Sequence, residues 1–411
     1  MERVVAGVGL VIFLAVAYLF SANRRAVSWR TVAWGLGLQL AIAVFMIKIP
    51  GGFAFFSFLA NLARSFLDFS DAGSRFVFGD AFTEHFFAFK VLPTIIFVSS
   101  TMSLLYYYGV LQRVVEGIGW IMMRTMGTSG AESLCAAANI FVGQTEAPLF
   151  IRPYVARLTV SELQAVMAGG FATIAAGVLA VYIGFGIPAE HLITAAVMGA
   201  PASLVMTKLL FPEVEEPETR GKTKSAIERS WVNPVDAAAA GAADGLRLAL
   251  NVAAMLIAFL ALLAMGNGLL GLLGRAIGVP GLSLELIFSY LFAPVAWLLG
   301  IPWSECPQVG VLLGKKTVLN EFIAYLDLKT LIENAAQAGG GQAATLAART
   351  VVIATYALCG FANFGSVAIQ IGGIGALAPS RQADLARLGF RALVAGTLAN
   401  LANGAISGIL L

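Results

Sequence analysis

The sequence predicts an all-α integral membrane protein built from two inverted copies of one helical unit. Of its 411 residues, 59% are hydrophobic and only 12% are charged, a composition that favours the bilayer over water as the solvent. The tripeptide Gly-Phe-Ala occurs at 170–172 and again at 360–362, each time downstream of a single glutamate, Glu146 or Glu321. Because acids are costly inside a membrane, a repeated acid indicates a substrate site at the interface between two repeats.

Eight apolar stretches are long enough to cross a bilayer. They are residues 4–21, 31–49, 87–108, 163–186, 190–211, 248–266, 351–375 and 389–411. A further stretch, 51–70, is amphipathic, and its apolar face carries Phe55, Leu59, Leu62 and Phe66. This pattern predicts a helix that lies in the membrane interface.

Residues 131–158 and 305–332 each consist of a short helical piece, a polar tip and a second short piece. Neither piece is long enough to cross, so we expect two re-entrant hairpins that line a cavity within the protein. One span, one hairpin and two further spans make three crossings in each copy. The second copy is therefore upside down, and the two tips meet near the midplane.

This organisation divides the chain into three parts. Residues 1–82 hold two spans and the interfacial helix, 83–231 form the first repeat, and 232–411 form the second, inverted repeat. The second copy is longer, mostly because of the Ala-, Gly- and Gln-rich residues 335–347, which we interpret as a loop insertion. With an outside N-terminus, the longest polar loop, 212–231, lies inside with its four Lys and Arg residues, as the positive-inside rule favours.

The hairpin tips carry the main candidates for ligand binding. Gln144, Thr145 and Glu146 precede Pro148, where the second half of the first hairpin is expected to begin. Their donors and acceptors, without a strong opposite charge, suit a neutral polar ligand such as a sugar or a nucleobase. Glu321 repeats the theme at the second tip. In the alternative, structural interpretation, Glu146 pairs with Arg152 or with a neighbouring hydroxyl, and Glu321 pairs with a lysine at 315 or 316.

Two further pairs of polar residues are candidates for ligand binding. One pair follows the second hairpin, and the other has one member in the first hairpin and one after it. Asn363 and Ser366 are three residues apart on one helix face, where they are suited either to bonding ligand hydroxyls or to joining helices. Asn139 and Thr173 supply neutral oxygens of the kind that Na⁺ prefers, and a broken helix would add backbone carbonyls.

Other classes of function find less support. The net charge of +3 is too small to indicate a nucleic-acid partner. No nucleophile–base pair or metal motif supports an enzyme, and Gly310–Thr317 only superficially resembles a phosphate loop. A channel would need a continuous polar stripe along several spans, whereas the polar groups here gather at two tips. The three cysteines form no Cys-x-x-Cys pair and are interpreted as buried thiols.

Three motifs carry a family resemblance: Gly-Gln-Thr-Glu-Ala-Pro at 143–148, Asn-Glu-Phe-Ile-Ala-Tyr at 320–325 and Gly-Phe-Ala-Asn-Phe-Gly-Ser at 360–366. In this order they resemble the motifs of the concentrative nucleoside transporters, from about the second span to the C-terminus. The resemblance implies eight spans and two re-entrant hairpins in a homotrimer of the inner or plasma membrane. It also implies cation-driven uptake of nucleosides by an elevator movement.

The resemblance further assigns roles to individual residues. Gln144, Thr145 and Glu146 would contact the nucleobase of a uridine-like substrate, with Val178 packing on it. Glu321, Asn363 and Ser366 would hold the ribose hydroxyls, with Phe361 alongside. Asn139 and Thr173 would give side-chain oxygens to Na⁺, and Val142 and Ile174 would give backbone oxygens. Spans 87–108 and 248–266 would form the scaffold.

The coupling ion follows from two positions. The proton-coupled branch of the family tends to carry Ser and Asn where this chain has Thr145 and Ala147, so the resemblance favours Na⁺. A proton-coupled nucleoside symporter remains an alternative. Without the resemblance, a symporter of another neutral polar solute, such as a nucleobase or a sugar, would fit the residues equally well.

Overall fold

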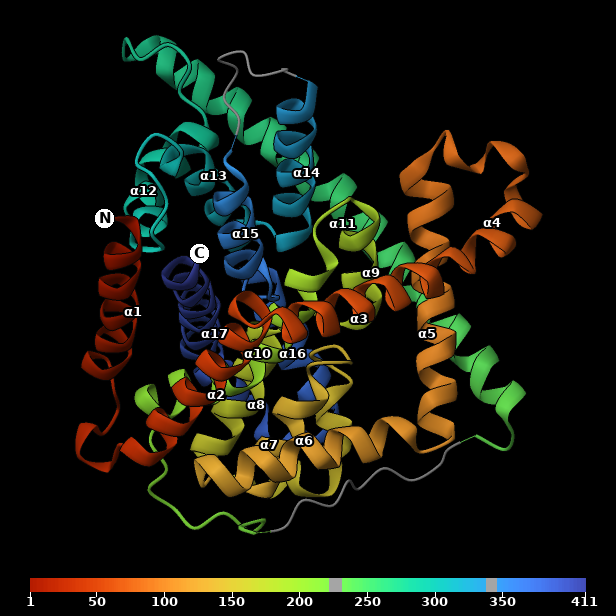
Figure 1. Cartoon of the computed structure of the whole chain (residues 1–411), viewed down its shortest axis with the longest axis vertical. Helices are drawn as coiled ribbons and strands as arrows, with labels where there is room; N and C mark the ends of the chain where they lie inside the picture. The colour runs from red at the N-terminus through yellow and green to blue at the C-terminus, as the bar shows by residue number, and fades with distance from the viewer. Residues whose placement is uncertain (222–230, 338–345) are drawn as a thin grey trace.

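The part of the chain that the computed structural model describes, residues 1–221, 231–337 and 346–411, contains helices and connecting turns but no strand (Figure 1). Within these residues, seven helical stretches are long and apolar enough to cross a membrane. They are Glu2–Leu19, Trp29–Lys48, Phe87–Tyr107, Val160–Gly184, Ala189–Leu210, Pro234–Ala276 and Pro379–Leu410. The predicted all-α membrane class is confirmed, and these stretches coincide with seven of the eight predicted spans.

The chain begins with α1 (Glu2–Leu19), α2 (Trp29–Lys48), α3 (Pro50–Asp68) and α4 (Ser70–Phe78). The predicted interfacial helix is α3, which crosses the front of the view in Figure 1. Gly52, Phe56 and Ala60 are buried against the protein, whereas Phe55 and Leu62 are exposed. An exposed apolar face is what an interfacial helix presents to lipid.

Two sets of helices in the same order follow. The first set is α5 (Leu92–Tyr107), α6 (Val110–Met126), α7 (Gly130–Ala138), the 3-10 helix η4 (Ala147–Arg157), α8 (Val160–Ala172), α9 (Ala176–Gly184) and α10 (Ala189–Leu210). The second set is α11 (Pro234–Ala276), α12 (Leu284–Leu298), α13 (Cys306–Val318), α14 (Glu321–Gln337), α15 (Ala348–Leu358), α16 (Phe364–Leu377) and α17 (Gln382–Leu410). The sequence analysis assigned neither α6 nor α12, because both are shorter than a span and α6 is strongly amphipathic.

The two hairpins, α7 with η4 and α13 with α14, correspond to the predicted re-entrant segments. Figure 1 shows α7 toward one end of the molecule and α13 and α14 toward the other. This arrangement agrees with hairpins that enter from opposite sides. The predicted loop insertion at 335–347 falls mostly on residues 338–345, which lie outside the described residues, and α14 itself extends to Gln337.

Two predicted spans are not continuous helices, which corrects the sequence analysis. The stretch 163–186 is broken between α8 and α9, where Thr173 is extended (φ −129°, ψ 172°). The stretch 351–375 is broken between α15 and α16, where Asn363 is extended and its side chain accepts from the Ser366 N–H. Hydropathy runs smoothly across both breaks, so it could not reveal them. Broken helices at membrane depth require hydrogen bonds from neighbouring segments.

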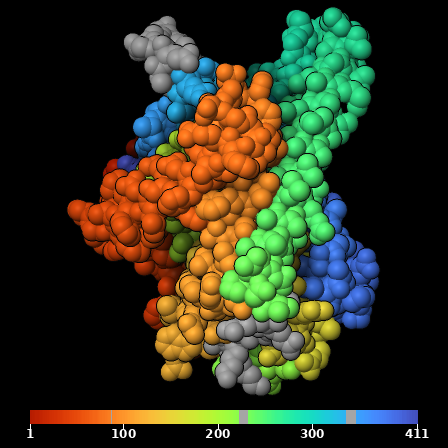
Figure 2. All heavy atoms as spheres, turned by 90° about the vertical axis from the view of Figure 1, so that its right-hand side faces the viewer, coloured from red at the N-terminus to blue at the C-terminus, as the bar shows by residue number. Residues whose placement is uncertain are grey.

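The sixth predicted span, 248–266, is only the centre of α11, which has 43 residues. Figure 2 shows α11 in green along the length of one face, beside α5 in orange. The two helices approach closely at Gly241 and Gly245, where an added Cβ would lie 2.4 Å from Ser103 Oγ and 2.7 Å from Ile96 Cα. Small residues therefore join α5 to α11, and the outer side of α11 leaves apolar residues such as Ile257 exposed.

Candidate functional site

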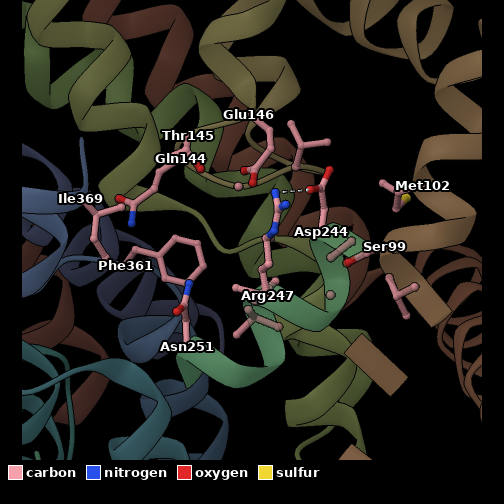
Figure 3. Close-up of a pocket in the computed structure, with 18 of the residues that line it drawn as sticks. Ser99, Met102, Gln144, Thr145, Glu146, Asp244, Arg247, Asn251, Phe361 and Ile369 are labelled. Atoms are coloured by element: carbon pink, nitrogen blue, oxygen red, sulfur yellow. Dashed lines mark ion pairs between the residues drawn. The ribbon is translucent and has the colours of Figure 1, made fainter. Parts of the chain in front are cut away.

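Both hairpin tips and both helix breaks open onto one cavity of about 1520 Å³. Its wall includes Gln144, Thr145, Glu146, Val178, Glu321, Phe361, Asn363 and Ser366, which are all the residues predicted to bind substrate. The opposite wall is formed by α5 and α11 (Figure 3). The inverted arrangement thus brings residues more than 200 positions apart into one site, as expected of a site at a repeat interface.

Gln144 is buried at the first tip and belongs to a chain of amides. Its Nε2 donates to Ser366 Oγ at 3.3 Å, and its Oε1 accepts from Gln370 Nε2 at 3.0 Å. Gln370 also donates to the carbonyl of Met167 at 3.0 Å, which fixes its own orientation. The amide at the first tip is therefore held in place by the second repeat before any ligand binds.

Glu321 is the first residue of α14, and both of its oxygens accept hydrogen bonds. Tyr182 donates from its hydroxyl to Oε1 at 3.0 Å, and Asn363 donates from Nδ2 to Oε2 at 3.2 Å. The Asn363 Oδ1 meanwhile caps α16 by accepting from the Ser366 N–H at 2.8 Å. A buried carboxylate held by two donors can still accept from ligand hydroxyls through its remaining lone pairs.

The structural interpretation of Glu321, an ion pair with a neighbouring lysine, is not what the described residues show. Lys315 pairs instead with Glu285 at 3.1 Å and with Asp327 at 2.8 Å. Lys316 donates to the Ala357 carbonyl at 2.8 Å and to Asn400 Oδ1 at 2.9 Å. The hydrogen bonds of Glu321 therefore come from Tyr182 and Asn363 and not from either lysine.

Glu146 is exposed to the cavity, and among the described ion pairs none joins it to Arg152. Its carboxyl instead has a side-chain hydrogen bond with the neighbouring Thr145 hydroxyl. In Figure 3 its side chain extends toward Asp244 and Arg247 of α11, which form an ion pair at 3.6 Å. With Asn251, these two residues line the cavity from one face of α11. The sequence analysis missed all three, although their spacing at the start of the predicted span 248–266 was a usable signal.

The predicted Na⁺ ligands lie beside the break between α8 and α9. Asn139 and Thr173 are both buried, and both lie against Gly169. Thr173 Oγ1 donates to the Gly169 carbonyl at 2.9 Å. A Cβ added at Gly169 would lie 3.1 Å from Asn139 Nδ2. Asn139 Oδ1 is buried without a hydrogen-bond partner. Val142 lines the cavity and Ile174 is fully buried in the break itself.

An unpartnered buried oxygen beside a helix break fits a small cation. Leaving a buried acceptor unsatisfied is costly, and a cation would relieve that cost. Groups of three or more His, Cys, Asp or Glu side chains suited to a transition metal do not occur among the described residues. The neutral oxygens of Asn139 and Thr173 suit Na⁺ better than such a metal.

Tyr182 and Gln370 are site residues that the sequence analysis missed. Tyr182 is the one polar side chain of α9, Gln370 lies with Ser366 in the otherwise apolar α16, and both are fully buried. Isolated polar residues in membrane helices are usually functional, so their position was the available signal.

Three family profiles match the chain. They are "Na+ dependent nucleoside transporter N-terminus" over residues 8–81, "Nucleoside recognition" over 88–189 and "Na+ dependent nucleoside transporter C-terminus" over 191–408. The succession of profiles covers nearly every element described above, including both hairpins and both helix breaks.

Curated relatives and solved structures agree with the profiles. Sodium/nucleoside cotransporter 1 of Mus musculus is 46% identical over 414 residues, which cover 100% of this chain and 64% of the relative. Solute carrier family 28 member 3 of Homo sapiens is 45% identical, covering 100% of this chain and 60% of the relative. The chain thus spans less than two thirds of the length of these relatives.

Among solved structures, CNTnw in an inward-facing substrate-bound state is 41% identical, with a TM-score of 0.91 over 100% of this chain and 98% of that chain. A variant of CNTnw in an outward-facing state is 40% identical, with a TM-score of 0.93 over 100% of this chain and 99% of that chain. Identity at this level along the whole chain, together with the shared fold, identifies the family. The chain belongs to the Na⁺-dependent nucleoside transporter family.

Proposed function

We propose that this protein is a secondary transporter that carries nucleosides into the cell together with Na⁺, without covalent chemistry. The observation that carries the proposal is the convergence of both hairpin tips and both helix breaks on one cavity, beside a buried oxygen without a partner. A site made from two inverted repeats can be exposed alternately on the two sides of a membrane.

In the proposed site, Gln144, Thr145 and Glu146 bind the nucleobase and Val178 packs on it. Glu321, Asn363 and Ser366 bind the ribose, with Phe361 at its side. Two features support this division: the first tip offers an amide and a hydroxyl beside Glu146, and at the second tip Glu321 is an acceptor suited to hydroxyl donors.

Na⁺ is the proposed coupling ion, bound by side-chain oxygens of Asn139 and Thr173 and by backbone oxygens of Val142 and Ile174. The cation would order the end of α7 against the break between α8 and α9. Because Gln144 follows Asn139 closely in the same hairpin, ordering one prepares the other. Coupling of this kind requires that each ligand favour the bound state of the other.

The proposed assembly is a homotrimer in the inner or plasma membrane, with the three parts 1–82, 83–231 and 232–411 in each chain. The exposed apolar residues of α11 and its close packing on α5 support a scaffold role for this pair, against which the rest moves as an elevator. A native mass of three chains in detergent would support the trimer, and a monomer would contradict it.

The test is uptake of labelled uridine into proteoliposomes, with an inward Na⁺ gradient compared with K⁺ at equal pH on both sides. Accumulation that requires Na⁺ is the expected result. Uptake driven by a pH gradient and indifferent to Na⁺ would instead favour the proton-coupled alternative. Accumulation of free nucleobases or sugars in place of uridine would contradict the assigned substrate class.

A further inference from the structure

The two helix breaks are joined directly to each other. The N–H of Phe361, in the second break, donates to the Thr173 carbonyl in the first at 3.1 Å. Asn400 of α17 makes the second connection: its Nδ2 donates to the Ala172 carbonyl at 2.9 Å and to the Cys359 carbonyl at 2.7 Å. One side-chain amide thus holds the last turn of α8 and the end of α15 together.

The orientation of this amide is set by a buried lysine from the second hairpin. Lys316 Nζ donates to Asn400 Oδ1 at 2.9 Å and to the Ala357 carbonyl at 2.8 Å. Because an ammonium group can only donate, it holds Oδ1 toward itself and leaves Nδ2 facing the two carbonyls. Lys316 is 3% exposed and Asn400 is 0% exposed, so water does not compete for these bonds.

Close packing around Asn400 leaves it little freedom. A Cβ at Gly360 would lie 2.4 Å from Asn400 Oδ1 and 2.6 Å from its Nδ2. On α17 itself, a Cβ at Gly396 would lie 2.3 Å from Phe171 Cβ. The glycine of the second Gly-Phe-Ala motif is therefore explained by the side chain of Asn400, and a shift of either break must be accommodated by this amide as well as by the Phe361–Thr173 bond.

We propose that Lys316 and Asn400 form a positioning unit that couples the cation site to the nucleoside site. The inference rests on the proposed function. One hydrogen bond of Asn400 holds the carbonyl of Ala172, the residue before the proposed Na⁺ ligand Thr173. The other holds the carbonyl of Cys359, two residues before Phe361, which lines the substrate cavity. A ligand that orders either break therefore restrains the other through the shared amide, and the effect is reciprocal.

The unit also connects the two tips. Lys316 lies five residues before Glu321 in the second hairpin, and Asn139 and Gln144 belong to the first. Substrate bound at Glu321 restrains the end of α13, and that restraint reaches the cation site through Lys316 and Asn400. A network with this role differs from simple structural hydrogen bonds, because its loss changes how one ligand affects the other.

The experiment measures the uridine KM in proteoliposomes at low and at saturating Na⁺, for the wild type and for Asn400→Ala. In the wild type, we expect KM to fall as Na⁺ rises. In Asn400→Ala, we expect the ratio of the two KM values to shrink by about fivefold or more, toward one. The matched control is Asn403→Ala, one turn later on α17, because Asn403 is equally buried and neither of its amide atoms has a partner.

A second pair of variants keeps the test valid if Asn400→Ala folds poorly. Lys316→Arg retains a buried cation with donors and is expected to keep most of the coupling, whereas Lys316→Met removes both donated bonds and is expected to lose it. Elution as a single species in size-exclusion chromatography establishes that each variant is folded.

Two results would overturn the inference. If the wild type shows Na⁺-dependent uptake and folded Asn400→Ala or Lys316→Met keeps the wild-type KM ratio, the positioning unit is wrong and the proposed function stands. If the wild type itself takes up uridine without regard to Na⁺, the proposed function fails and the inference fails with it.

Discussion

At the scale of single residues, Glu321 concentrates more of the proposed chemistry than any other side chain in the site. Tyr182 and Asn363 both direct hydrogen-bond donors at its carboxylate, at 3.0 and 3.2 Å. These bonds fix its rotamer and leave lone pairs aimed at the cavity. Charge-assisted bonds to a buried acceptor are stronger than neutral ones, so the charge itself matters to affinity.

Glu321→Gln is therefore expected to raise the uridine KM roughly ten- to a hundredfold, which corresponds to a loss of about 1.5–3 kcal/mol. The amide nitrogen of glutamine would face either the Tyr182 hydroxyl, which can also accept, or Asn363 Nδ2, so at most one of the two bonds within the site is lost. Initial rates of labelled-uridine uptake at saturating Na⁺ give the measurement. Glu333→Gln, on the exposed side of the same helix, serves as the control and should keep the wild-type KM. An unchanged KM in Glu321→Gln would show that the ribose assignment is wrong.

Asn139 is the second residue whose role can be isolated. Its Oδ1 is buried without a hydrogen-bond partner, so Asn139→Ala removes an unpaired oxygen and breaks no hydrogen bond made by that oxygen. We expect the Na⁺ concentration for half-maximal uptake to rise, with uptake at saturating Na⁺ largely kept. Gln164→Ala removes another buried amide with both atoms unpartnered, and it should leave the Na⁺ response unchanged. A wild-type Na⁺ response in Asn139→Ala would exclude it from the cation site.

At the scale of elements, the base of the first hairpin is held by charges that lie away from the ligand cavity. Ser129 caps α7 and Thr159 caps α8, each through a reciprocal capping box with a glutamate three residues later. Glu132 of α7 then reaches Lys208 of α10, with Oε2 and Nζ 2.7 Å apart. These contacts tie the outer ends of α7, α8 and α10 together, so that the tip can respond to ligands on a fixed base.

Glu132→Gln should destabilise the protein, because the Lys208 ammonium stays buried with only the more distant Glu213 carboxylate, at 3.5 Å, as a counter-charge. Removing one partner of a buried pair costs about 3–5 kcal/mol, and Glu213 should keep the loss near the lower end. Thermal unfolding of the purified protein in detergent measures the effect as a lower melting temperature. Arg220→Gln breaks an exposed pair with Glu216, worth about 0–1 kcal/mol, and is the control. Equal melting temperatures for the two variants would contradict this account of the hairpin base.

At the scale of the whole molecule, the arrangement predicts which ends face the cytoplasm. In Figure 1 the base of α7 and the end of α10 lie at one end of the long axis, and the last turn of α11 lies at the other. The positive-inside rule places the first of these ends in the cytoplasm.

Single cysteines test this orientation, because the three native cysteines are buried and should react little. We expect Glu216→Cys to react with a membrane-impermeant thiol reagent only after the cells are permeabilised. Arg275→Cys, at the far end of α11, should react in intact cells. Both positions are exposed, so a cysteine that is not labelled in intact cells must lie on the cytoplasmic side and not inside the protein. The opposite labelling pattern would invert the proposed orientation and require the hairpins to enter from the other sides.

Much of the site could be predicted from the sequence, because its signals are local. A polar tripeptide before a proline, or an acid in an apolar segment, stands out wherever the chain folds, and every residue predicted to bind substrate does line the cavity. The apolar composition likewise determined the membrane class and most of the helix positions. The repeated glutamate and Gly-Phe-Ala motifs indicated two copies, and the odd number of crossings in each copy indicated that they are inverted.

Only the tertiary structure decided where the spans break and what holds the site. Hydropathy is the same on both sides of Thr173 and Cys359, so the breaks depend on donors from elsewhere, such as Asn400, which lies 228 residues from Ala172. Tyr182 and Gln370 likewise reach partners 139 and 226 residues away. Composition and motifs depend on neighbouring residues, whereas a hydrogen bond between distant segments exists only once packing has brought its two ends together.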